Sequence, residues 1–77
     1  MTKTEMLRIR KYLNDKFETT KISLKPTNSS DGSVEFLYDG EFMGVIYRDE
    51  DEGEVSYNLN LAILEIDLPG ASDAALI

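Results

Sequence analysis

The sequence predicts a small α+β domain in which an N-terminal helix packs on a four-stranded antiparallel meander. Three observations indicate this architecture: an apolar stripe at helical spacing near the N-terminus, polar turn signals between short β-rich segments, and the agreement of two turns on one buried face. With 77 residues there is room for one domain, which we expect to span residues 1–68, followed by a disordered tail over residues 69–77.

The expected helix covers residues 3–18. Thr2 and Glu5 have the spacing of a capping box, in which a hydroxyl and a carboxylate accept from free backbone N–H groups at a helix start. The stripe recurs at steps of three, four and four, and it leaves Arg8 on the opposite side of the helix. Its members are Met6, Ile9, Leu13 and Phe17. A stripe of this kind has to be buried against another element.

Four strands are expected near residues 21–25, 33–38, 41–48 and 54–62. The first strand ends at Pro26, which cannot donate a ladder hydrogen bond and therefore suits an edge strand. The pair Asp39-Gly40 favours a two-residue type I′ turn, because both positions accept a positive φ. That turn places Phe36 opposite Met43.

The connection after Arg48 is interpreted as a five-residue loop, residues 49–53, which pairs Arg48 with Glu54 and puts Val45 opposite Tyr57. Both turns then place the apolar residues of the sheet on one face, which the helix stripe covers. The expected core consists of Met6, Ile9, Leu13, Phe17, Phe36, Met43, Val45, Tyr57 and Leu59. Residues 62–68 fit either a continuing strand or a short helical turn.

Composition excludes several classes of function. The chain has no histidine and no cysteine, so the usual zinc, haem and iron-sulfur ligands are absent. It also has no glycine-rich phosphate loop, and we expect no catalytic activity and no cofactor. No apolar run approaches the roughly 18 to 20 residues of a transmembrane helix, and the N-terminus does not resemble a signal peptide. We therefore expect a soluble, cytoplasmic protein.

The net charge of −7 is unevenly distributed along the chain. Residues 1–25 carry seven bases and three acids, a net charge of +4. Residues 26–77 carry one base and twelve acids, a net charge of −11. An acidic protein repels nucleic-acid phosphates and anionic lipids, so we expect binding neither to nucleic acid nor to a membrane.

Residues 44–68 read GVIYRDEDEGEVSYNLNLAILEIDL. This run resembles the shared segment of a family of short, uncharacterised alphaproteobacterial proteins, the domain of unknown function family three-one-two-six. The resemblance covers residues 3–68, and the stretch YRDEDEGE is its most specific part. It implies a bacterial origin and a small stand-alone domain, and it brings no activity, cofactor or catalytic residue with it.

The acidic residues 49–54 form the first candidate site, because calcium and magnesium bind several carboxylate oxygens on one loop. The spacing does not fit an EF-hand, since counting from Asp49 puts Gly53 at position five and Asn60 at position twelve. A solvated hairpin tip is the preferred interpretation. A cation-responsive domain that binds calcium or magnesium through this loop remains the alternative function.

The second candidate site is an apolar patch on the sheet face opposite the helix, with Gly44 leaving a flat spot for another surface to approach. The residues expected to form an interface are Leu37, Phe42, Ile46, Leu64, Ile66 and Leu68. We expect a protein–protein interaction module, either a homodimer or a docking site for an unknown protein partner. In the competing interpretation, residues 62–68 fold back over their own patch and the protein is a monomer.

Overall fold

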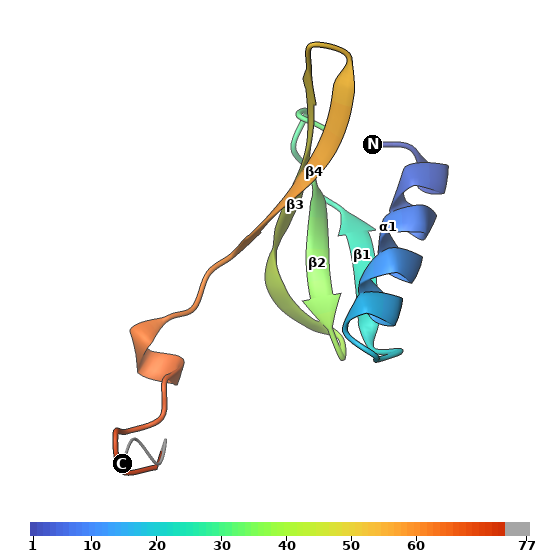
Figure 1. Cartoon of the computed structure of the whole chain (residues 1–77). Helices are drawn as coiled ribbons and strands as arrows, with labels where there is room; N and C mark the ends of the chain where they lie inside the picture. The colour runs from blue at the N-terminus through green and yellow to red at the C-terminus, as the bar shows by residue number, and fades with distance from the viewer. Residues whose placement is uncertain (74–77) are drawn as a thin grey trace.

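The computed structural model describes residues 1–73 and confirms the predicted α+β class, with one helix lying on a four-stranded antiparallel sheet (Figure 1). The elements are α1 (Lys3–Lys16), β1 (Ile22–Pro26), β2 (Val34–Tyr38), β3 (Glu41–Asp51), β4 (Glu54–Leu61) and a short 3₁₀ helix, η1 (Glu65–Asp67). The strands are neighbours in chain order, as a meander requires. The expected disordered tail extends to residue 77, and its last four residues lie outside the described ones.

Both ends of α1 are fixed by polar groups. At its start the capping box is present as predicted, with the Glu5 backbone N–H donating to the Thr2 hydroxyl and the Thr2 N–H donating to the Glu5 carboxylate. At its end the Asn14 side chain accepts from the Ile22 N–H at 2.9 Å and donates to the Ile22 carbonyl at 3.0 Å. The helix ends two residues earlier than predicted, because Glu18 adopts a positive φ of 52°.

The pairing of β2 with β3 begins as predicted and then shifts. Asp39 and Gly40 have φ values of 53° and 82°, which form the expected turn, and Leu37 lies opposite Phe42. A β-bulge follows, so that Phe36 pairs with Gly44 and not with Met43. The extra residue shifts the alternation of side chains by one, so each later residue of β3 points to the face of the sheet opposite to the one predicted. The prediction that Val45 is a core residue is therefore wrong. Ile46 points into the core instead.

The second hairpin also differs from the prediction. Glu52 and Gly53, with φ values of 51° and 83°, form a two-residue turn, and β3 continues through Asp51. Arg48 therefore pairs with Tyr57 and not with Glu54. A two-residue turn with positive φ matches the twist of antiparallel strands, and the acidic side chains around it stay in water. No five-residue loop forms, although the apolar residues of β4 still face the helix side.

The buried core is small and centred on β1, β2 and the middle of β3. Its buried apolar members are Ile22, Val34, Phe36 and Ile46, and its partly buried ones are Met1, Met6, Ile9, Leu13, Leu24, Met43 and Leu59. Two predicted core residues are exposed instead: Phe17 follows the end of the helix, and Tyr57 lies on the projecting hairpin. Figure 1 shows α1 running along β1, while the β3–β4 hairpin rises beyond the other strands. Among the described residues, neither helix has the length and apolarity to cross a membrane.

The bulge can be tested by comparing neighbouring residues of β3. Ile46→Ala should lower the free energy of unfolding by about 2–5 kcal/mol, because it leaves a cavity in the core, and the milder Ile46→Val by about 0.5–1.5 kcal/mol. Val45→Ala, on the other face, should have a much smaller effect. Urea unfolding followed by circular dichroism measures all three. A larger loss for Val45→Ala than for Ile46→Ala would contradict the observed register.

Gly44 is predicted to resist the addition of a single methyl group. A Cβ at this position would collide with the Asn60 carbonyl oxygen and lie 3.0 Å from the Leu61 Cα, both on β4. Gly44→Ala should therefore destabilise the fold by about 1–3 kcal/mol in the same unfolding assay. Gly70→Ala is the control, since its nearest heavy atom lies 3.6 Å away, an ordinary contact. Equal stability of the two variants would contradict the close approach of β3 and β4.

Candidate functional site

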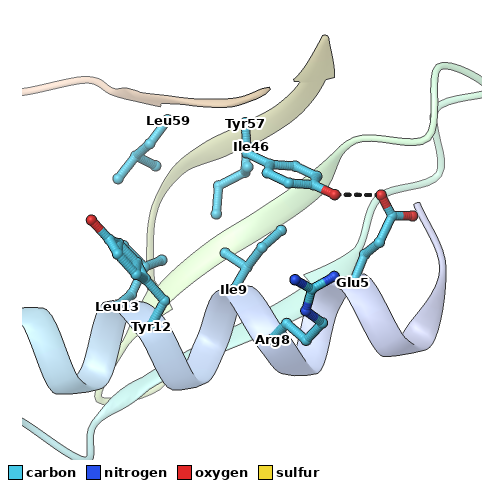
Figure 2. A pocket seen from close by; sticks show the side chains of 8 residues that line it. All are labelled: Glu5, Arg8, Ile9, Tyr12, Leu13, Ile46, Tyr57 and Leu59. Atoms are coloured by element: carbon cyan, nitrogen blue, oxygen red, sulfur yellow. Dashed lines mark hydrogen bonds between the residues drawn. The ribbon is translucent and has the colours of Figure 1, made fainter. Parts of the chain in front are cut away.

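A groove of about 380 Å³ lies between α1 and the strands β3 and β4 (Figure 2). It exists because α1 covers the β1 side of the sheet and leaves the β4 side partly open. In Figure 2, Ile9 extends from the helix toward Ile46, and Leu59 extends from β4 toward the helix. The groove is lined by Glu5, Arg8, Ile9, Tyr12, Leu13, Ile46, Tyr57 and Leu59.

Glu5 closes one end of this groove with a cluster of hydrogen bonds. One carboxylate oxygen accepts from the Thr2 backbone N–H at 2.9 Å. The other accepts from the Arg48 Nε at 2.9 Å and from the Tyr57 hydroxyl at 2.5 Å. Arg48 in turn donates to Glu50 at 3.0 Å. The cluster links the first turn of α1 to the projecting β3–β4 hairpin.

The electrostatics of the cluster follow from these contacts. Hydrogen bonds from the Thr2 backbone and from Tyr57 lower the pKa of Glu5 from 4.5 to about 2. The hydrogen bond to Glu5 raises the pKa of the Tyr57 hydroxyl, and those to Glu50 and Glu5 raise the pKa of Arg48. The Glu5 side chain is therefore ionised near neutral pH, where its carboxylate holds the cluster together.

The groove also contains two residues that the sequence analysis missed. Arg8, expected on the opposite side of the helix from the apolar stripe, lines the groove, and it takes part in none of the ion pairs among residues 1–73. Tyr12 is 58 % exposed at the groove. The sequence spacing could have identified this face of the helix. Glu5, Ile9 and Tyr12 are separated by four and three residues, which places them on one helix face. That row runs beside the predicted apolar stripe.

The predicted interface patch is only partly recovered. Leu37 is half-buried and Phe42 is exposed on the face opposite the helix. The prediction that Ile46 belongs to this patch is wrong. The bulge places Ile46 on the helix side of the sheet, where it is 1 % exposed. Val45 and Tyr47 occupy the patch face in its place.

The C-terminal half of the predicted interface lies apart from the patch. Residues 62–64 are irregular and residues 65–67 form η1, which resolves the open choice between strand and helix for this segment. Leu64, Ile66 and Leu68 are all exposed. Figure 1 shows the segment leading away from the sheet, so the structure does not bring it together with Leu37 and Phe42 within one chain.

The acidic residues 49–54 do not form a loop around a common centre. They lie along two paired strands and a two-residue turn, so successive carboxylates point to opposite faces of the hairpin. Within residues 1–73 no group of three or more acidic side chains is arranged to hold a metal ion. Glu50 is instead paired with Arg48.

A scan of known protein families matches residues 5–67 to the family described as Protein of unknown function (DUF3126). The chain belongs to this family. The match confirms the resemblance seen in the sequence, and it includes most of the segment that follows β4. A search of the curated proteins and a search of the solved structures gave no match. The family description assigns no activity, so function has to be inferred from the residues themselves.

The Glu5 cluster predicts a specific pH dependence. Because the pKa of Glu5 is lower in the folded state than in the unfolded chain, its contribution to stability is present above pH 4.5 and is lost as the pH falls toward 2. Glu5→Gln keeps the capping-box geometry but removes the charge. The variant should be less stable than the wild type near neutral pH, and the difference should shrink as the pH falls through this window.

Urea unfolding midpoints measured at neutral and acidic pH test this expectation. Glu54→Gln is the control, since Glu54 also carries a negative charge but makes no side-chain hydrogen bond or ion pair among the described residues. It should be neutral or slightly stabilising, because it relieves repulsion at the acidic hairpin tip. A gap between wild type and Glu5→Gln that stays constant with pH would contradict the assigned role.

Proposed function

We propose that the chain is a protein–protein interaction module that self-associates and has no catalytic activity. The observation that carries this proposal is the imbalance between buried and exposed apolar side chains. Within residues 1–73, four apolar side chains are buried, whereas thirteen large ones are exposed. These thirteen side chains are spread over α1, the sheet and the segment after β4. Exposed apolar side chains that gather on one surface are typical of interaction sites.

The distribution of the exposed groups supports the same proposal. Neither α1 nor β4 contains a fully buried residue, although both carry apolar side chains toward the groove. β4 is also an edge strand, and from Val55 to Leu61 it contains no charged residue and no proline. Edge strands of monomers usually carry charged residues or proline, which prevent pairing with the strand of another chain. An edge without them favours association with another surface.

The groove chemistry gives no support to catalysis. A general base works best when its pKa lies near the operating pH, whereas the pKa of Glu5 is about 2 and both of its oxygens accept hydrogen bonds. The chain supplies no histidine or cysteine as an alternative. The groove is therefore better suited to binding an apolar segment than to chemistry. No observation favours the cation-binding alternative, since residues 1–73 contain no group of three or more acidic side chains arranged to hold a metal ion.

Self-association predicts concentration-dependent behaviour. Sedimentation velocity across the micromolar to hundred-micromolar range should show a shift from monomer toward dimer. The thermal midpoint should rise with protein concentration, because association stabilises the folded state by mass action. Calcium or magnesium at millimolar concentration should leave the midpoint unchanged. A monomer throughout this range, with a midpoint independent of concentration, would overturn the proposal.

A further inference from the structure

We infer that the groove between α1 and β4 binds residues 62–68 of a second copy of this chain, and that the two copies exchange these segments reciprocally. This inference rests on the proposed self-association and specifies the surfaces that carry it. The segment that leaves β4 is called the C-terminal segment below, and it comprises residues 62–68.

The C-terminal segment has the properties of a binding element. Ile63, Leu64, Ile66 and Leu68 are 70 %, 59 %, 88 % and 55 % exposed. Its own backbone hydrogen bonds are local, from Asp67 to Leu64 and from Leu68 to Glu65. Figure 1 shows it projecting beyond the sheet. The family match extends through residue 67, so the segment belongs to the shared family domain and is not an unrelated appendage.

The groove and the C-terminal segment are complementary in charge as well as in apolarity. The groove carries Arg8 on its helix wall, and α1 as a whole has five bases and two acids. The segment carries Glu65 and Asp67 between its apolar residues, and no base. Glu5 also lines the groove, but its carboxylate is already paired with Arg48 and accepts from Tyr57. Arg8, which is in none of the ion pairs among residues 1–73, is therefore the charge on the groove wall that the acidic side chains of the segment can meet.

The direction of the chain favours a second copy over the chain's own segment. β4 ends at Leu61, two residues after the groove-lining Leu59, so the chain would have to reverse immediately to enter its own groove. Residues 61–66 contain no glycine, proline, asparagine, aspartate or serine, the residues that tight turns favour. The first such residue is Asp67, followed by Pro69-Gly70. The segment therefore continues outward, and twofold symmetry allows each copy to fill the groove of the other.

The test compares three full-length variants, and then a fourth with exchanged charges, with the wild type by sedimentation velocity. Leu64→Ser/Ile66→Ser removes apolar contacts from the C-terminal segment at positions that are exposed in the single chain, so its fold should persist. Arg8→Glu reverses the charge of the groove wall. Phe42→Ser is the matched control, an apolar residue 54 % exposed on the opposite face of the sheet. Circular dichroism checks that each variant is folded.

We expect the first two variants to raise the dimer dissociation constant at least about tenfold and Phe42→Ser to leave it nearly unchanged. Adding Glu65→Lys and Asp67→Lys to Arg8→Glu should restore association, because the charges are then exchanged on both surfaces. Loss of the dimer in Phe42→Ser alone would overturn this inference and leave self-association standing. A wild type that is monomeric throughout would overturn both.

Discussion

The carboxylate of Glu5 is the contact on which the arrangement of this fold depends. It completes the helix cap with Thr2 and, through its other oxygen, accepts from Arg48 and Tyr57, which lie 43 and 52 residues further along the chain. Met6, Ile9 and Leu13 of α1 pack against the core but are only partly buried, so they contribute less burial than fully buried side chains would. The polar cluster at its start and the Asn14 bonds to β1 at its end fix its position over the sheet. The width of the groove follows from that position.

The second constraint is the close approach of β3 to β4 at Gly44. Only a residue without a Cβ fits against the Asn60 carbonyl, and the bulge beside Gly44 sets which side chains of β3 face the helix. Ile46 is thereby placed at the base of the groove, and Val45 is turned to the reverse face. The bulge therefore both completes the core and changes which residues form the apolar patch on the sheet face opposite the helix.

A chain of 77 residues buries little surface, and this one leaves much of its apolar surface exposed on α1, β4 and the segment beyond. Small domains of this kind gain stability from disulfides, metals or association. The chain has no cysteine for a disulfide, and within residues 1–73 no group of three or more acidic side chains is arranged to hold a metal ion. On our proposal, association with a second copy supplies the missing burial, and the groove and the C-terminal segment are the complementary surfaces.

The sequence by itself determined the helix, its capping box, the four strands and the Asp39-Gly40 turn, because each depends on residues close together in the chain. The apolar residues after β4 were also recognised from the sequence, but their position relative to the sheet was not. The tertiary structure decided the register of β3, the two-residue turn at Glu52-Gly53 and the long-range partners of Glu5, Arg48 and Tyr57. A bulge of one residue reverses which face of the sheet each later residue of β3 points to. The local sequence does not distinguish Val45 from Ile46, because both are apolar and β-branched. The groove was also invisible in the sequence, since its walls come from segments that only folding brings together.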